Sequence, residues 1–179
     1  MYEGIFIAGF GGQGVILTGR LICLAAMRDG KFVSHIPSYG AEVRGGTANC
    51  SVVVSDEEIA SPLVPNPSIL ITLNAPSFLK FQPMVKPGGL LIYNSSLIDA
   101  APSRTDIEVA AVSANDIAEE MGSYRAANMV ALGRLLRLRP VAAMESVLAS
   151  LEEAVSARNK ELNAVNRKAL LKGYDGHEA

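Results

Sequence analysis

The hydrophobic pattern of the first 122 residues alternates between short apolar runs and segments with helical spacing. The apolar runs have the length and the β-branched content that are typical of strands. They cover residues 4–8, 31–35, 47–55, 68–73, 90–93 and 107–112. Helical spacing predicts helices over 12–28, 76–82 and 113–121. This alternation predicts an α/β protein, Rossmann-like, with a mostly parallel sheet flanked by helices.

From residue 124 onward the pattern is helical and contains no further strand. Pro140 ends the first of these helices because it cannot continue the hydrogen-bonded backbone, and further helices are predicted over 141–158 and 159–172. We therefore expect a helical C-terminal segment, about 124–172, that covers one face or one edge of the sheet. At 179 residues, the chain is expected to form one domain, 1–179.

A glycine-rich loop joins the first predicted strand to the first predicted helix. Gly9, Gly11 and Gly14 fit the spacing G-x-G-x-x-G, and Gly12 and Gln13 complete the loop. This spacing indicates a binding site when it lies between a strand and a helix, as it does here. The glycines allow a partner to approach the backbone closely, and the free N–H groups of a helix start attract an anion such as phosphate.

The second predicted strand argues against a stand-alone NAD(P) site. Such a site carries an Asp or Glu at the end of that strand, where the carboxylate binds the ribose hydroxyls. Here the strand ends in Ser34 and His35, and Asp29 lies before its other end. An independent NAD(P)-dependent oxidoreductase is therefore the weaker alternative, and His35 is best interpreted as a packing residue.

A polar segment follows this strand, where α/β proteins commonly place binding groups. Its candidate binding residues are Ser38, Tyr39, Gly40, Glu42, Arg44, Gly45 and Gly46. The guanidinium of Arg44 can form two parallel hydrogen bonds with a phosphate or carboxylate, and Glu42 can orient it. The alternative is a solvated connection in which both charges stay in water.

Composition and charge narrow the classes of partner. The formal net charge is −2 with scattered Lys and Arg, so nucleic-acid binding has no electrostatic basis. No apolar run reaches the roughly 18 residues that span a bilayer, and the first residues do not resemble a secretion signal. We therefore expect a cytoplasmic protein without membrane contact. With 49% hydrophobic and 19% charged residues, part of its apolar surface is expected to be covered by other chains.

Potential metal ligands are scarce in this chain. Cys23 and Cys50 lie far apart, each among apolar neighbours, and we expect buried free thiols in a reducing compartment. The sequence has no C-x-x-C spacing and only two histidines, His35 and His177. The chain by itself is therefore not expected to hold an iron–sulfur cluster or another metal ion.

Four motifs follow one another in register along the chain. They are the glycine loop 9–14, the polar segment 38–46, the turn Lys86-Pro87-Gly88-Gly89 and the segment 127–133, which reads Ala-Asn-Met-Val-Ala-Leu-Gly. Together they resemble the gamma subunit of 2-oxoacid:ferredoxin oxidoreductases, over about residues 3–155. The polar segment is most similar to that of the 2-oxoglutarate and branched-chain 2-oxoacid branch, although Ala41 stands where many of those proteins have proline.

The resemblance implies a complex in which several subunits divide the chemistry. Alpha and beta subunits would hold thiamine diphosphate with Mg²⁺ and decarboxylate a 2-oxo acid. Two electrons would then pass through [4Fe-4S] clusters, on a ferredoxin-like delta subunit where present, to ferredoxin, and CoA would take the acyl group. This chain would hold no cofactor alone, would be inactive alone, and would shape the CoA and substrate side of a shared cleft.

The resemblance also suggests roles for the candidate residues. The backbone N–H groups of the glycine loop would receive an anion or dock a neighbouring subunit, and the amide of Gln13 could contact a cofactor or a subunit. Tyr39 suits an interface, and Asn128 joins the set through the fourth motif, although core packing and helix capping explain these two residues equally well. A further alternative is an assembly module without catalytic function, whose glycine loop only packs against partner subunits.

Overall fold

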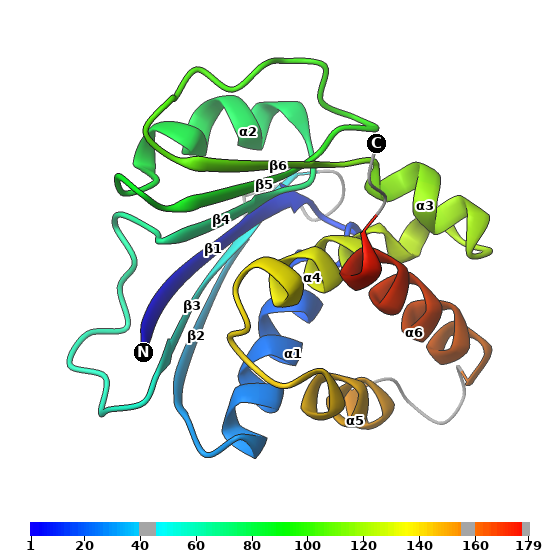
Figure 1. The fold of residues 1–179 in the computed structure, drawn as a ribbon, viewed down its shortest axis with the longest axis horizontal. Coiled ribbons are helices and arrows are strands. Elements are labelled where there is room, and N and C mark those ends of the chain that lie inside the picture. The colour runs from blue at the N-terminus through cyan, green and yellow to red at the C-terminus, as the bar shows by residue number, and fades with distance from the viewer. Residues whose placement is uncertain (40–45, 155–159, 177–179) are drawn as a thin grey trace.

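The computed structural model describes residues 1–39, 46–154 and 160–176. Its strands and α-helices follow one another in the predicted order (Figure 1). Two short 3-10 helices, η1 and η2, lie between them. In chain order the elements are β1 (Tyr2–Phe10), α1 (Val15–Arg28), β2 (Phe32–Tyr39), β3 (Thr47–Ser55), β4 (Ile69–Thr72), α2 (Ala75–Phe81), η1 (Gln82–Met84), β5 (Leu90–Asn94), β6 (Glu108–Val112), α3 (Ala114–Glu120), η2 (Tyr124–Ala126), α4 (Ala127–Leu138), α5 (Met144–Ala154) and α6 (Lys160–Asp175).

The six strands form one sheet in the order β2-β3-β1-β4-β5-β6. Parallel pairing joins β1 to β4, β4 to β5 and β5 to β6, whereas β3 is antiparallel to both β1 and β2. Five strands therefore run in one direction, which confirms the predicted mostly parallel α/β sheet. The carboxyl ends of β1, β4, β5 and β6 consequently lie along the same edge, where parallel sheets place their binding residues.

Strand β2 is longer than the hydrophobic pattern predicts. Residues paired with β3 continue past His35 as far as Tyr39, which lies opposite Ala48. Pro37 is tolerated within β2 because the strand lies at the edge of the sheet and needs hydrogen bonds on one side only. The expected loop 38–46 was therefore wrong at its first two residues, since Ser38 and Tyr39 belong to the strand.

Helix α1 begins at Val15, three residues later than predicted. Gly12 and Gly14 have φ angles of 99° and 75°, and a right-handed helix cannot include such residues. The helix ends close to the expected position, where Gly30 adopts a φ of 75° and its N–H donates to the carbonyl of Met27.

The sheet separates two hydrophobic cores. The larger core joins one face of the strands to α1, α4, α5 and α6, so the C-terminal helices cover one face of the sheet as expected (Figure 1). The smaller core lies on the other face, where Phe78 of α2 belongs to one buried cluster with Phe6 and Leu91 of the strands. Cys23 and Cys50 are free and buried in the larger core, as predicted. Burial raises the pKa of each thiol to about 12.

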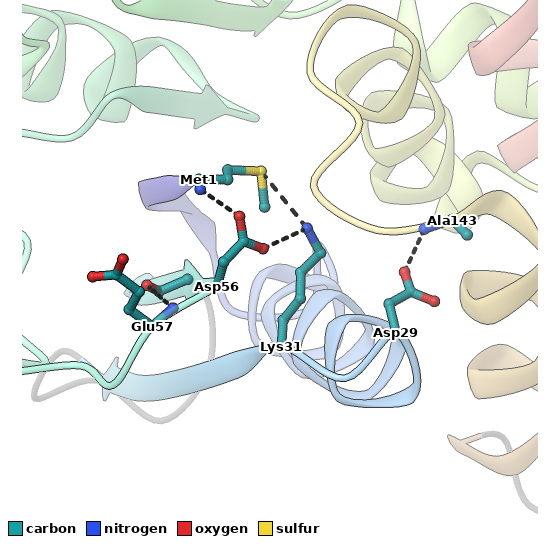
Figure 2. A network of polar contacts seen from close by, with 7 residues as sticks. Met1, Asp29, Lys31, Asp56, Glu57 and Ala143 are labelled. Carbon is teal, nitrogen blue, oxygen red and sulfur yellow. Dashed lines mark hydrogen bonds and ion pairs between the residues drawn. The ribbon is translucent and has the colours of Figure 1, made fainter.

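A polar network ties the chain start to two other parts of the fold (Figure 2). The carboxylate of Asp56, just after β3, accepts hydrogen bonds from the N-terminal ammonium of Met1 and, at 3.3 Å, from the ammonium of Lys31. These neighbours lower the pKa of Asp56. A separate hydrogen bond is made by Asp29, the residue after the last turn of α1. Its carboxylate accepts from the backbone N–H of Ala143 at 2.6 Å, which connects the end of α1 to the start of α5.

Candidate functional site

The glycine loop leaves the first turn of α1 open. Gly14 occupies the N-cap position, and none of the described side chains forms a capping hydrogen bond there. The N–H groups of such a turn have no partner within the helix, and the helix dipole adds positive potential at the same place. The loop is also bonded to the residue before β3, because the N–H of Gly11 donates a hydrogen bond of 2.9 Å to the carbonyl of Gly46. The geometry is therefore suited to receive an anionic group.

Gln13 connects the glycine loop to the ends of two strands. Its Oε1 accepts hydrogen bonds from the N–H of Phe10 at 2.7 Å and from Nδ2 of Asn74 at 3.3 Å. Its Nε2 donates to the carbonyl of Leu73 at 3.0 Å. Gly9 provides the space, because a Cβ atom at that position would lie 2.6 Å from Oε1 of Gln13. The side chain thus braces β1 against β4, while its predicted contact with a cofactor or subunit stays a prediction.

Asn128 supports the glycine loop from a distant part of the chain. Its side chain is buried at the start of α4, and Nδ2 donates to the carbonyl of Gly14 at 3.3 Å and to Oγ1 of Thr18 at 3.2 Å. A Cβ atom on Gly14 would lie 2.3 Å from this Nδ2. Two residues chosen from separate motifs therefore interlock, and Asn128 positions the loop through hydrogen bonds.

A hollow of about 240 Å³ opens beside the loop, at the carboxyl ends of the parallel strands. We call it the glycine-loop hollow. It is lined by Gly12, Gln13, Leu73, Asn94, Leu97, Asn115, Tyr124, Arg125 and Ala127. The lining combines backbone and side-chain amides, one guanidinium and one aromatic ring with an apolar floor. Such a mixture suits a ligand with a charged or polar part and an apolar part.

Seven of these lining residues were missed by the sequence reasoning, and the four with polar or aromatic side chains are Asn94, Asn115, Tyr124 and Arg125. Asn94 ends β5, and its Nδ2 donates to Oδ1 of Asn115 at 2.8 Å while its Oδ1 accepts from the N–H of Ala114 at 3.1 Å. The signal available in the sequence was position alone, because each residue lies at the end of a strand or at the start of a helix. Tyr124 and Arg125 are exposed, and within the described residues Arg125 takes part in no ion pair.

The second predicted binding segment is only partly within the described residues. Ser38 is exposed near the end of β2, and Gly46 contacts the glycine loop through the hydrogen bond to Gly11. The remaining candidates lie outside the described residues: Gly40, Glu42, Arg44 and Gly45. The fold therefore brings one end of the segment against the glycine loop, and the binding roles assigned to its side chains stay predictions.

His35 lies away from the hollow, against helix α1. Its Nε2 is buried and has no hydrogen-bond partner among the described residues, and a Cβ atom on Gly19 would lie 2.8 Å from it. Burial lowers the pKa of His35, and the nearby charge of Arg20 lowers it further. In the part of the chain that the structure describes, no group of three or more His, Cys, Asp or Glu residues gathers as a metal site would require. None of the described helices is long and apolar enough to cross a bilayer.

Comparison with known proteins identifies the family. Residues 4–176 match the family described as pyruvate ferredoxin/flavodoxin oxidoreductase. The chain belongs to this family. Subunit KorC of 2-oxoglutarate synthase from Methanocaldococcus jannaschii is 35% identical over 179 residues, which cover 98% of this chain and 94% of KorC. The resemblance inferred from the four sequence motifs is thereby confirmed.

Other members of the oxidoreductase family carry the same fold within a longer chain. Ketoisovalerate oxidoreductase subunit VorA from Methanothermobacter marburgensis is 41% identical over 132 residues, which are 74% of this chain but 27% of VorA. The chain therefore spans about a quarter of that relative. A structure of 2-oxoglutarate:ferredoxin oxidoreductase from Magnetococcus marinus, with 2-oxoglutarate, coenzyme A and succinyl-CoA bound, matches with a TM-score of 0.88 at 28% identity, over 97% of this chain and 30% of that one.

Proposed function

We propose that this chain is a gamma-type subunit of a cytoplasmic 2-oxoacid:ferredoxin oxidoreductase. The complex converts a 2-oxo acid, with 2-oxoglutarate as the first candidate, to an acyl-CoA and passes the electrons to ferredoxin. The observation that carries the proposal is the alignment with KorC, which extends over nearly the full length of both chains. Thiamine diphosphate with Mg²⁺ and the [4Fe-4S] clusters are assigned to alpha, beta and, where present, delta subunits.

In this proposal the glycine-loop hollow receives part of CoA. The glycine loop before α1, which lines the hollow through Gly12 and Gln13, and the guanidinium of Arg125 supply hydrogen-bond donors and positive potential for a phosphate group. The exposed ring of Tyr124 offers a surface on which an adenine can stack. Coenzyme A is bound in the Magnetococcus marinus relative, which supports this ligand class. This chain's residues would bind and orient CoA, while the chemistry takes place on the thiamine cofactor.

The assembly module remains a second candidate because two observations favour it. All the hydrogen bonds described for Gln13 are made within the chain, so its side chain already has partners without a ligand. Large apolar side chains are also exposed on and around the loop, among them Phe10, Leu97 and Tyr124. Under this alternative these side chains would be covered by a partner subunit, and the hollow would stay empty in the working complex.

The NAD(P) alternative is weakened further by the strand order. Strand β3 separates β1 from β2, whereas a dinucleotide fold places its second strand beside the first. The end of β2 is therefore displaced from the glycine loop by one strand. Titration of the isolated chain with NADH, followed by fluorescence, tests this alternative directly, and we expect no saturable binding in the micromolar range.

Purification of the complex provides the main test. The chain is tagged in its native host and captured under anaerobic conditions, and 2-oxoacid- and CoA-dependent reduction of a viologen dye is measured. We expect partner subunits with thiamine diphosphate and iron–sulfur clusters, and the 2-oxo acid with the highest kcat/KM identifies the substrate. Capture of the chain alone, folded and without activity in the fraction, would refute the proposal.

A pair of variants separates CoA binding from assembly. Arg125→Gln removes the guanidinium that lines the hollow, and Arg167→Gln removes an equal charge from the exposed face of α6. If the hollow binds CoA, Arg125→Gln raises the KM for CoA by about tenfold or more, which is the loss expected for one charged hydrogen bond. Arg167→Gln should leave this KM unchanged. An unchanged KM in both assembled complexes would favour the assembly module.

A further inference from the structure

A second hollow, of about 170 Å³, lies at the carboxyl end of the edge strand β6. We call it the basic hollow. Its lining residues with polar or charged side chains are Ser95, Ser113, Arg134 and Lys172. Ser95 follows β5, and its N–H donates to the carbonyl of Val112 at 2.8 Å, so the ends of β5 and β6 are joined at this place.

The two cations meet because helices α4 and α6 are in backbone contact. A Cβ atom on Gly133 would lie 2.1 Å from the carbonyl oxygen of Leu170, and a Cβ atom on Gly173 would lie 2.1 Å from that of Val130. No larger side chain is compatible with such an approach at either position. Arg134 and Lys172 are the sequence neighbours of these two glycines. The close crossing of the helices therefore holds their side chains at one hollow.

The charges in the basic hollow are not balanced within the described chain. Its lining includes no acidic residue, and neither cation takes part in an ion pair among the residues that the structure describes. Other arginines of the chain are paired, since Arg28, Arg104 and Arg139 each contact a carboxylate. Both cations are half-buried, and two like charges at one half-buried place repel each other. An anion between them would convert this repulsion into attraction.

The hydroxyl groups add donors that match an anion. Ser113 occupies the N-cap position of α3, but its side chain makes no capping hydrogen bond, so the hydroxyl is available to another acceptor. Arg and Lys are donors only, and each Ser hydroxyl can donate as well. An arrangement of four donor groups with a net charge of about +2 complements phosphate oxygens, which are acceptors only.

We propose that the basic hollow is a second anion-binding site, for a phosphate or a carboxylate group, outside the glycine-loop hollow. The two sites are neighbours, because Asn94 and Asn115 line the glycine-loop hollow while Ser95 and Ser113 line the basic hollow. The anion is either a free ion or the charged end of a larger molecule. The site depends on residues that the function proposed above does not use, so each proposal can be tested and refuted without the other.

Titration of the full chain with inorganic phosphate tests the site, by ³¹P NMR or by calorimetry in a low-salt buffer free of phosphate. We expect saturable binding that weakens by about tenfold or more in Lys172→Gln and in Arg134→Gln, the loss of one charged hydrogen bond in each. Lys168→Gln, one helical turn earlier and exposed on α6, is the matched control and should change the Kd by less than about twofold, because solvent screens its charge.

Two further variants keep the test decisive if a Gln variant unfolds. Lys172→Arg retains the charge and should retain binding, whereas Ser113→Ala removes one hydroxyl and should weaken phosphate binding several-fold. Absence of phosphate binding, or an equal loss in Lys168→Gln and Lys172→Gln, overturns the proposal. A parallel titration with adenosine 5′-monophosphate distinguishes the sources. Tighter binding than phosphate, lost again in Lys172→Gln, indicates the charged end of a larger ligand, and binding no tighter than phosphate indicates a free ion.

Discussion

Replacement of Gly14 by alanine tests how the glycine loop is held. Gly14 has a φ angle of 75°, and a residue with a Cβ atom pays about 1–2 kcal/mol in this left-handed conformation. The new methyl group would also lie 2.3 Å from Nδ2 of Asn128, so the Asn128 side chain must move. This movement breaks the hydrogen bonds to the Gly14 carbonyl and to Thr18, and an unsatisfied buried amide costs about a further 1–3 kcal/mol.

The sum predicts that Gly14→Ala lowers the free energy of unfolding by about 2–5 kcal/mol. Gly30→Ala is the matched control, because Gly30 has the same φ of 75° but no atom lies within 4 Å of a Cβ placed there. It should cost only the conformational term, about 1–2 kcal/mol. Urea denaturation followed by circular dichroism measures both values, provided that the m value stays constant.

The contact with Asn128 can be isolated by a double-mutant cycle. Asn128→Ala removes the amide that the new methyl group would meet, so Gly14→Ala in this background should again cost only about 1–2 kcal/mol. The interaction energy of the cycle is therefore expected to be at least about 1 kcal/mol. If Gly14→Ala destabilises the protein no more than Gly30→Ala does, the interlock between the loop and α4 is not a source of stability, and the reasoning is refuted.

Three further predictions concern titratable groups. The folded state lowers the pKa of His35, so the unfolded state binds its proton more tightly, and stability is complete above the ordinary histidine pKa of about 6.5 and falls as the pH drops below it. Urea titrations from pH 8 to pH 5 should show this loss, and His35→Asn should reduce it. The folded state also lowers the pKa of Asp56, so its contribution to stability is present above the ordinary carboxyl range and is lost as the pH falls through the lowered pKa. Asp56→Asn should abolish this loss of stability at acid pH. If the dependence of stability on pH is the same in the variant, the network of Figure 2 is contradicted. With thiol pKa values of about 12, Cys23 and Cys50 should react with a disulfide reagent at pH 8 only after unfolding in urea, and rapid reaction of the native protein would show that one of them is accessible.

The glycine-loop hollow and the basic hollow lie at the same edge of the sheet. Both open at the carboxyl edge of the parallel strands, and both are lined by residues that follow β5 or surround the start of α3. Candidate binding residues therefore lie at two places along this edge, not only at the glycine loop. If the Arg125 and Lys172 variants change different titrations, the two hollows act as separate sites on this edge.

Local patterns were sufficient for most elements of the fold. The alternation of Ala48, Cys50, Val52 and Val54 predicted β3, because strand side chains alternate between faces and one face of this strand is buried. The glycine spacing predicted the turn before α1, since residues with positive φ favour glycine whatever the surroundings. Each of these properties depends on residues within a few positions of one another, so the sequence by itself determined them.

Pairing between strands was decided by the tertiary structure. The hydrophobic pattern does not state that β3 lies between β1 and β2, because a half-buried strand has the same alternation beside either neighbour. The continuation of β2 through Pro37 depends likewise on its place at the sheet edge, where the missing N–H is tolerated. The sequence interpretation, which ended this strand at His35, therefore misplaced Ser38 and Tyr39.

In the candidate sites, too, the sequence selected residues and the tertiary structure decided which of them meet. Sequence analysis selected Gly14 and Asn128 as members of separate motifs, but their contact across 114 positions appears only in the folded chain. Arg125, Arg134 and Lys172 carry no local signal, since charged residues on helices are usually solvated. They become candidates because long-range packing, including the glycine contacts between α4 and α6, brings them to hollows at one edge of the sheet. Local sequence determined which elements form, and packing between distant elements determined which side chains meet.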